Sequence, residues 1–352
     1  MQYARLGDTG LIVSRLAFGA MTFGTSDGIF AAVSKVAGQD LANQLVHKAL
    51  DAGINHFNTA DVYTAGQSET MLGKALGARR QDVVISTKVG FRTGPALVHQ
   101  GLSRHHILAS AEDSLRRLGT DYIDVYLVHR PDLFTPIEET LEALDTLART
   151  GKVRYVGFSN WNAWRAAKAV GLQIQNGWAR FRAAEMYYSL VGRDVEQEIV
   201  PFAQDAGIGI LAWSPLAGGF LSGKYSRENP QGDGGRLAAI DFIPRDQEKS
   251  YNAIERLRTI ASARGESVAQ IALAWLLAKP AVSSILLGAN KVSQLEDNLG
   301  AADLSLSSEE IASLDELTAP ALVYPNWFAA RAAVDVPVRD ALTGQKEIQT
   351  GA

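Results

Sequence analysis

Short apolar runs alternate with longer amphipathic stretches along almost the whole chain. The apolar runs have the length of strands and lie at residues 15–19, 54–58, 83–88, 123–129, 153–158, 181–186, 208–213 and 283–287. Stretches with a helical period separate them, at residues 40–52, 68–77, 104–118, 137–150, 161–170, 194–206, 250–264 with 267–278, and 292–299. The pattern therefore predicts eight strand–helix units in succession.

The apolar runs are almost continuous, which is typical of parallel strands that are covered on both faces. Each connection is long enough for a right-handed crossover. Eight such units favour an α/β fold with a closed (β/α)8 TIM barrel over an open sheet. Two doubly wound domains remain the alternative, although no low-complexity linker divides the chain.

The chain is longer than the about 250 residues that such a barrel needs. We assign the surplus to an N-terminal β-hairpin at residues 3–13, an insertion at 24–38, a Gly-rich loop at 226–247 and a tail after 318. We expect one domain over residues 1–352, with a barrel core at 3–317 and a C-terminal tail at 318–352.

Composition narrows the classes of partner and site. The chain has 352 residues and a net charge of −4, and this mild acidity disfavours nucleic acid and anionic membranes as partners. No apolar run reaches the about 18 residues of a membrane span, and the first residues lack the features of a signal peptide. The absence of cysteine excludes disulfides and thiolate sites. We expect a cytoplasmic protein, and its oligomeric state stays open.

Polar residues stand at the ends of three predicted strands. Tyr63 follows the run at 54–58, Lys88 ends the run at 83–88, and His129 ends the run at 123–129. Because the carboxyl ends of barrel strands meet at one face, we expect these side chains to converge. A tyrosine has an ordinary pKa of about 10, so it acts as an acid near neutral pH only beside a cation or donors.

These strand ends, together with Gly157-Phe158-Ser159-Asn160 and Trp213-Ser214-Pro215-Leu216, resemble the aldo-keto reductase superfamily. The resemblance extends from Tyr3 to Leu317 and is strongest to the branch of bacterial reductases and potassium-channel beta subunits. It implies an oxidoreductase that uses NADPH to reduce a small-molecule aldehyde or ketone to an alcohol.

The resemblance also implies a role for each polar strand-end residue. Tyr63 would protonate the carbonyl oxygen as hydride arrives. Lys88 would lower the pKa of Tyr63, and His129 would orient the carbonyl.

Two positions depart from the family pattern. Asn58 stands where the family has an aspartate that pairs with the lysine, and Asp61 is displaced from that position. We expect the Asn58 amide oxygen to accept a hydrogen bond from Lys88 and to leave Lys88 less neutralised. Glu185 replaces the family's glutamine, which binds the nicotinamide carboxamide, so a carboxylate that only accepts hydrogen bonds would face the ring.

The remaining cofactor residues follow from the same resemblance. Ser159 and Asn160 match carboxamide ligands, and Trp213 matches an aromatic residue that stacks on the nicotinamide. Residues expected along the cofactor are Gly19, Met21, Thr22, Ser214, Pro215, Leu216, Gly218, Lys224, Arg236, Gly288, Asn290, Gln294, Asp297 and Asn298. The three cations Lys224, Arg236 and Lys291 favour NADPH over NADH.

The substrate pocket is expected to include Arg130, Trp161, Tyr324 and Trp327, together with the loops at 24–38 and 226–247. The aromatic tail favours a bulky apolar ketone. Two other functions stay open: a regulatory subunit that holds NADPH with little turnover, and an aldolase that uses Lys88 as a Schiff-base amine.

Overall fold

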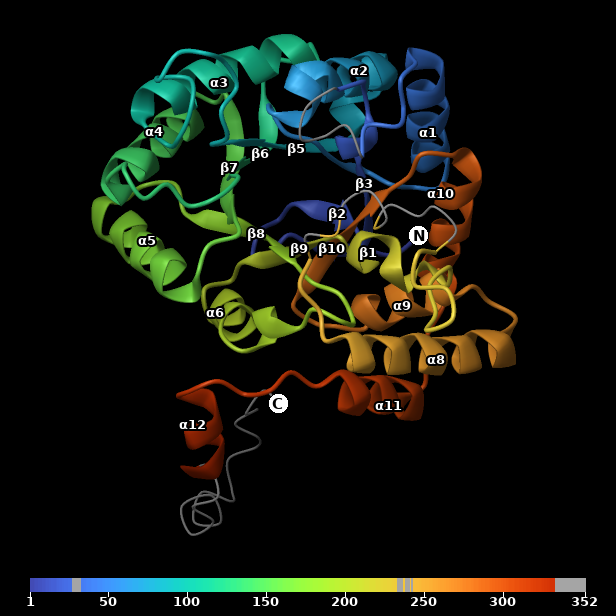
Figure 1. Cartoon of the computed structure of the whole chain (residues 1–352). Coiled ribbons are helices and arrows are strands. Elements are labelled where there is room, and N and C mark those ends of the chain that lie inside the picture. Colours follow the sequence, from blue (N-terminus) through green and yellow to red (C-terminus); the bar gives the residue numbers. More distant parts are fainter. Residues whose placement is uncertain (27–32, 233–236, 238–240, 242, 333–352) are drawn as a thin grey trace.

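Parallel strands close into a barrel in the order β10-β3-β4-β5-β6-β7-β8-β9, and helices surround it (Figure 1). This computed structural model describes residues 1–26, 33–232, 237, 241 and 243–332. The predicted (β/α)8 barrel with an N-terminal hairpin is confirmed, and the alternative of two open-sheet domains is wrong.

The strands agree closely with the predicted apolar runs. Their bounds are β1 (Tyr3–Arg5), β2 (Ile12–Ser14), β3 (Leu16–Gly19), β4 (His56–Asn58), β5 (Val84–Val89), β6 (Ile123–Val128), β7 (Val153–Ser159), β8 (Phe181–Tyr187), β9 (Gly209–Trp213) and β10 (Val282–Gly288). Strands β4, β5 and β6 are buried throughout, as parallel strands between a filled interior and an outer helical layer must be.

The helices form a ring outside the strands (Figure 1). Their bounds are α1 (Gln39–Asp51), α2 (Gln67–Leu76), α3 (Arg104–Leu118), α4 (Ile137–Arg149), α5 (Ala163–Asn176), α6 (Ile199–Asp205), α8 (Gln247–Arg264), α9 (Val268–Leu277), α10 (Val292–Leu299), α11 (Ser308–Thr318) and α12 (Asn326–Ala332). Short 3-10 helices are η1 (Ala20–Thr22), η2 (Tyr63–Gly66), η3 (Gly77–Asp82), η4 (Asp194–Glu196), η5 (Ala217–Ser222) and η6 (Gly300–Asp303).

One predicted helix is divided. The stretch at 194–206 forms η4 and then α6, because the backbone leaves the helical region at Glu198, where φ is −138°.

Among the described helices, none has both the length and the apolar character that a bilayer span requires.

The hairpin β1–β2 fills the amino-terminal end of the barrel. Leu6 and Val13 are fully buried and belong to one cluster with Val84, Val125 and other interior side chains. The turn docks on the start of β9, where Asp8 N donates to Gly207 O at 3.0 Å. A Cβ at Gly7 would lie 2.4 Å from Gly207 O, so this close approach requires glycine.

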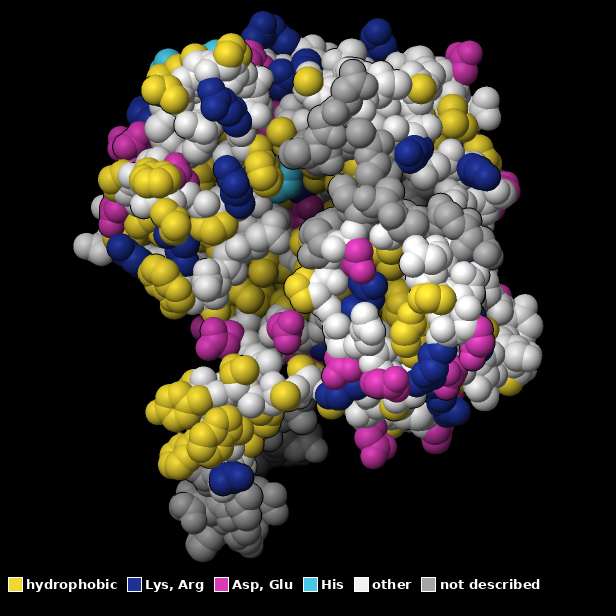
Figure 2. Space-filling view, viewed as in Figure 1, with side chains coloured by type: hydrophobic (Ala, Val, Ile, Leu, Met, Phe, Trp, Pro, Cys, Tyr) yellow, Lys and Arg dark blue, Asp and Glu magenta, His cyan; other side chains and the backbone are white. Residues whose placement is uncertain are grey.

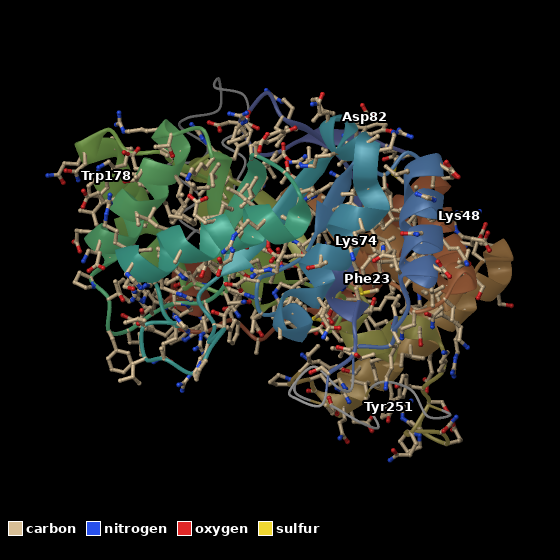
Figure 3. All side chains as sticks on the ribbon, turned by 90° about the horizontal axis from the view of Figure 1, so that it is seen from above. Phe23, Lys48, Lys74, Asp82, Trp178 and Tyr251 are labelled. Carbon is tan, nitrogen blue, oxygen red and sulfur yellow. The ribbon has the colours of Figure 1, made fainter. Side chains whose placement is uncertain are left out.

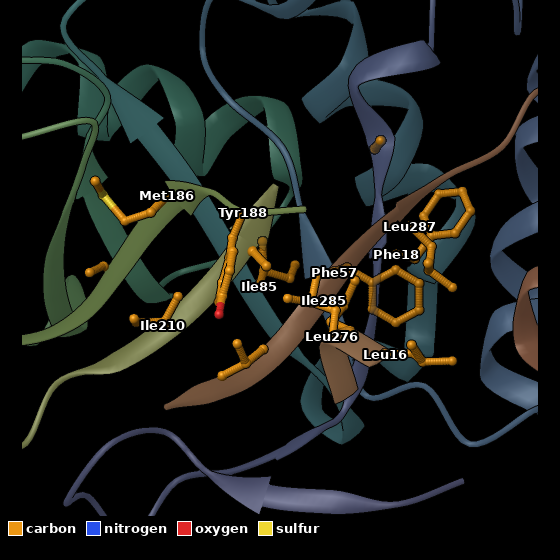
Figure 4. Packing of buried hydrophobic residues seen from close by; sticks show 14 of the residues in the cluster. Leu16, Phe18, Phe57, Ile85, Met186, Tyr188, Ile210, Leu276, Ile285 and Leu287 are labelled. Carbon is orange, nitrogen blue, oxygen red and sulfur yellow. The ribbon is translucent and has the colours of Figure 1, made fainter. Parts of the chain in front are cut away.

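The outer apolar layer lies between the strands and the ring of helices. Phe18 of β3 and Phe57 of β4 have ring centroids 6.1 Å apart, and Leu287 of β10 lies beside them (Figure 4). Leu276 of α9 closes the same cluster from the helical side (Figure 4). This layer fixes the strands and thereby the positions of their carboxyl ends.

On β5 the inward-facing residues change from apolar to polar along the strand. Because side chains alternate with a period of two, Val84 and Lys88 of β5 share one face. Val84 belongs to the cluster with the hairpin, whereas Lys88 lies at the opposite end among polar groups. The inner face of the barrel therefore runs from an apolar floor to a polar mouth.

The C-terminal segment leaves the barrel after α11. Helix α12 lies outside the helical ring, and its apolar side chains form a group beyond the barrel (Figures 1 and 2). Tyr324 is 74% exposed and Trp327 is 39% exposed. Both aromatic residues lie outside the barrel, so the expectation that they shape the substrate pocket is not met.

Candidate active site

A cavity of about 970 Å³ opens at the carboxyl ends of the barrel strands. Asn58, Tyr63 and His129 line it, and they come from β4, η2 and the end of β6. Lys88 lies just behind this surface and is fully buried. The structure therefore brings together all four residues for which the sequence predicted a catalytic role.

Tyr63 stands at the start of η2, a tightly folded loop that follows β4. Thr64 and Ala65 adopt left-handed conformations with φ of 51° and 53°, which are costly for residues other than glycine. The Thr64 hydroxyl donates to Phe23 O at 2.6 Å and holds the loop against η1. This folding turns the Tyr63 side chain into the cavity, where only 7% of the residue is exposed.

The Lys88 ammonium is the centre of a polar network. Its Nζ donates to Asn58 Oδ1 at 2.8 Å, to Thr59 O at 2.9 Å and to the Tyr63 hydroxyl oxygen at 3.2 Å. The expected hydrogen bond from Lys88 to the Asn58 amide is present.

Glu185 does not lie as the sequence analysis expected. Its Oε1 is 3.2 Å from Lys88 Nζ, and its Oε2 accepts a hydrogen bond from Asn58 Nδ2 at 2.7 Å. Both carboxylate oxygens thus face the lysine network, although the residue also lines the cavity. The expectation that Lys88 is less neutralised is wrong, because a carboxylate from β8 is in contact with it.

Burial and charge act in opposite directions on the two central groups. Burial raises the pKa of Tyr63 and outweighs the lowering effect of the Lys88 ammonium. Burial lowers the pKa of Lys88, but the Glu185 carboxylate and Tyr63 raise it more, so the net change is upward. Near neutral pH the pair is therefore a protonated phenol beside an ammonium.

His129 faces Tyr63 across the cavity. Their ring centroids are 5.6 Å apart with an edge-on geometry, and Phe91 packs on the other side of His129 at 4.7 Å. Burial, followed by the charges of Lys88 and Arg130, holds the pKa of His129 well below its usual range. The neutral imidazole can donate one N–H toward a group in the cavity.

Ser159, Asn160 and Trp213 form a second polar group on the cavity wall. Asn160 Nδ2 donates to His129 O at 3.1 Å and to Ser159 Oγ at 2.9 Å, and Trp213 Nε1 donates to Asn160 Oδ1 at 3.1 Å. Asn160 has a φ of 58°, and Ser214 a φ of 53°, so the backbone is strained on both sides of this group. These bonds fix the plane of the Trp213 ring.

The cavity continues from these residues to the start of α10. The predicted cofactor residues that line it are Gly19, Met21, Thr22, Ser159, Asn160, Glu185, Trp213, Ser214, Pro215, Leu216, Gly218, Lys224, Gly288, Asn290, Gln294, Asp297 and Asn298. Arg236 lies outside the described residues. One elongated cavity therefore joins the polar strand ends to the other residues that the sequence resemblance implies along the cofactor.

The far end of this cavity has a cation and a hydrogen-bond acceptor that suit a nucleotide. Lys291 lines the cavity at the N-terminus of α10, where the helix dipole favours an anion. Asn290 Oδ1 is buried and has no hydrogen-bond partner among the described residues, which suits an acceptor for a ligand group. The residues present therefore fit a dinucleotide.

Two predicted substrate residues lie elsewhere. Trp161 is 1% exposed and packs against Phe158 and Phe181 in the outer layer, with centroids 5.9 and 5.7 Å away. Arg130 stacks on the outer side of Phe91, with its guanidinium 4.4 Å from the ring centroid. Neither residue lines the cavity, and the expectation for Trp161 is wrong because its ring faces away from the barrel interior.

Several cavity residues were not predicted. They include Val33, Lys35, Phe91, Gly219, Ser222, Tyr225, Ala269, Leu286 and Leu287. Lys35 and Val33 lie in the insertion at 24–38, for which the sequence predicted only a loop near the pocket. Phe91 follows Lys88 by three residues, so its place just past a strand end was a signal that could have found it.

The part of the chain that the structure describes contains no group of three or more acidic or histidine side chains able to hold a metal ion.

Comparison with known proteins gives a consistent result. Residues 15–319 match the sequence model of the Aldo/keto reductase family. The chain is 35% identical over 352 residues to versiconal hemiacetal acetate reductase of Aspergillus parasiticus, a match that covers 92% of this chain and 99% of that protein.

Two further relatives are a second reductase and a probable channel subunit. L-glyceraldehyde 3-phosphate reductase of Escherichia coli K12 is 34% identical over 330 residues, with 90% of this chain and 92% of that protein covered. A probable voltage-gated potassium channel subunit beta of Arabidopsis thaliana is 38% identical over 313 residues, with 86% and 92% covered. The chain therefore belongs to the aldo/keto reductase family of oxidoreductases.

Proposed function

We propose that the protein reduces an aldehyde or ketone to an alcohol with NADPH, and that Tyr63 is the general acid. The observation that carries this proposal is the 3.2 Å contact between Lys88 Nζ and the Tyr63 hydroxyl oxygen at the wall of a cavity that fits a dinucleotide. The dihydronicotinamide supplies the hydride that the carbonyl carbon accepts.

Tyr63 gives its hydroxyl proton to the carbonyl oxygen, so that an alcohol forms as the carbon is reduced. The phenolate that remains is stabilised by the adjacent Lys88 ammonium, because opposite charges attract strongly in a buried site. The neutral His129 donates an N–H to the same carbonyl oxygen and fixes its direction. Solvent returns the proton to Tyr63 after the alcohol leaves.

The preference for NADPH rests on three lysines. Lys35, Lys224 and Lys291 all line the cavity, and ammonium groups favour the additional phosphate of NADPH. Trp213, held by its bond to Asn160, would offer a flat aromatic surface to the nicotinamide ring.

The structure disfavours an aldolase that uses Lys88. A Schiff-base amine has to be unprotonated and accessible to a carbonyl carbon. Lys88 is fully buried, its pKa is raised, and its ammonium hydrogens point at the oxygens of Asn58, Thr59 and Tyr63.

The test is steady-state oxidation of NADPH by a panel of aldehydes and ketones, followed by absorbance and repeated with NADH. Turnover of at least one carbonyl class, with NADPH preferred, is the expected result. Tight binding of NADPH with no turnover across the panel would contradict the proposal and favour a regulatory subunit. Borohydride trapping of substrate on Lys88 would instead indicate an aldolase.

A further inference from the structure

The charge of the buried Lys88 is balanced from the far side of the barrel interior. Lys88 lies on β5, and the carboxylate nearest to its ammonium belongs to Glu185 on β8, at 3.2 Å. Both side chains are almost completely buried, with exposed fractions of 0% and 4%. A buried ammonium without a counter-ion is costly, so this contact stabilises the charged form of Lys88.

An ammonium has three hydrogens, and Lys88 has four oxygen partners. The two shortest contacts, at 2.8 and 2.9 Å, go to neutral oxygens of Asn58 and Thr59. The Tyr63 hydroxyl and the Glu185 carboxylate, both at 3.2 Å, share what remains. Glu185 and Tyr63 therefore depend on the same ammonium, so a change at one of them alters the contact with the other.

Asn58 connects the two charged groups. Its amide oxygen accepts from Lys88, and its amide nitrogen donates to Glu185 Oε2 at 2.7 Å and to Ser86 Oγ at 2.8 Å. All of its hydrogen-bonding groups are thus in use. An aspartate at this position could not donate to Glu185, so the amide at 58 and the carboxylate at 185 depend on each other.

We propose that Glu185 is a positioning residue for the proton donor: its carboxylate is the counter-ion of Lys88, and Asn58 is the neutral connector between them. This inference rests on the proposed function for its kinetic consequences. The sequence resemblance implies an aspartate at position 58 and a glutamine at position 185, and relative to that pattern the two departures of this chain amount to one exchange. The carboxylate has moved from β4 to β8, and the amide has moved from β8 to β4.

The proposal predicts the direction in which the pH profile of kcat/KM shifts in each protein of a double-mutant cycle: the native protein, the two single variants and the double variant. Glu185→Gln leaves the ammonium uncompensated, so Lys88 acts more strongly on Tyr63 and the alkaline limb of kcat/KM for reduction moves to lower pH. Asn58→Asp adds a second carboxylate and moves that limb to higher pH. Each shift is about one pH unit or more, and the double variant returns to within about half a unit of the native protein.

The other titratable groups around Lys88 are unchanged in all four proteins. They are His56 on β4, Asp61 and Tyr63 after it, and His129 after β6. A purely structural role for Glu185 would reduce the rate without opposite shifts in the two single variants. Equal profiles in all four proteins, shifts of the same sign in the two single variants, or a double variant that keeps the shift of one single variant would overturn the proposal.

Urea unfolding of the cofactor-free proteins tests the counter-ion without any turnover. Glu185→Gln is expected to raise the unfolding equilibrium constant about a hundredfold or more, and Asn58→Asp in the same chain to recover at least about tenfold of this loss. If the Glu185→Gln variant does not fold and the double variant does, the proposal is supported equally. Additive losses would contradict it, whereas a native protein that turns over no carbonyl would contradict the proposed function alone.

Discussion

The ammonium of Lys88 lies 3.2 Å from the hydroxyl oxygen of Tyr63, although Lys88 belongs to β5 and Tyr63 to η2, the turn after β4. Burial raises the pKa of the phenol, and in the proposed reaction the cation stabilises the anion that would remain after proton transfer. A group that holds its proton at rest and yields it to a developing oxyanion has the properties of a general acid.

Tyr63→Phe should abolish most of the reduction while leaving cofactor binding intact. The ring and its packing remain, but the proton donor is removed, and kcat should fall about 10²- to 10⁴-fold. Turnover and the Kd for NADPH, followed by fluorescence, measure the two effects separately. Tyr126→Phe is the matched control, because this equally buried phenol of β6 lies in the outer cluster, away from the cavity. Full activity in Tyr63→Phe would exclude the proposed acid.

Lys291→Gln should weaken NADPH more than NADH. The side chain lines the cavity at the N-terminus of α10, so the variant removes a charge-assisted contact with the additional phosphate. KM for NADPH should rise about tenfold, which corresponds to about 1.4 kcal/mol, with KM for NADH nearly unchanged. Lys48→Gln is the control, since Lys48 pairs with Glu296 on the outer surface between α1 and α10 (Figure 3). An equal rise for both cofactors would argue against a role in phosphate recognition.

Arg117→Met should destabilise the loop that carries Tyr63. Arg117 Nε lies 2.6 Å from Glu69 Oε2, and the Glu69 side chain is fully buried. Removal of the guanidinium leaves this buried carboxylate without a counter-ion. The free energy of unfolding in urea should therefore fall by on the order of 3 kcal/mol. Its neighbour provides the comparison: Arg116 is 74% exposed and pairs with Asp113, so Arg116→Met should change the free energy of unfolding by less than about 1 kcal/mol. Similar losses in both variants would refute the assignment.

His56 should make the protein sensitive to acid. Burial, together with Lys88, lowers the pKa of His56 from 6.5 to about 3. The unfolded chain takes up a proton below pH 6.5 that the folded chain refuses, so stability falls as the pH drops from 6.5 toward 3, by about 1.4 kcal/mol per unit. His56→Gln can still donate to Ser86 and should flatten this slope. Urea unfolding between about pH 4 and about pH 8, which covers most of the interval below the ordinary histidine pKa, measures this slope. An unchanged slope would assign the acid sensitivity to other groups.

Periodicity was sufficient to predict the barrel and the place of its site. Alternation with a period of two places Lys88 inside once β5 is assigned, and the carboxyl ends of neighbouring strands then bring Tyr63 and His129 to it. Helix α11 was also within reach of the sequence, because Ser307 and Glu310 form a capping box at its start.

Other features depend on side-chain directions that a pattern does not contain. Glu185 is on the inner face in either interpretation, and only the measured contacts show that its carboxylate turns to Lys88 and Asn58. Trp161 immediately follows the strand-end residues Ser159 and Asn160, yet its ring packs outward against Phe158 and Phe181. The position of the aromatic tail depends on where the chain leaves α11, which no local pattern determines.

The hairpin at the amino-terminal end has a kinetic consequence. Leu6 and Val13 occupy the interior below the polar strand ends, so small molecules reach Tyr63 from the opposite face. In the proposed reaction both reactants enter from this one face, so we expect ordered binding in which the reactant that lies deeper is the first in and the last out. Closure of the barrel floor thus links the fold to the order of binding.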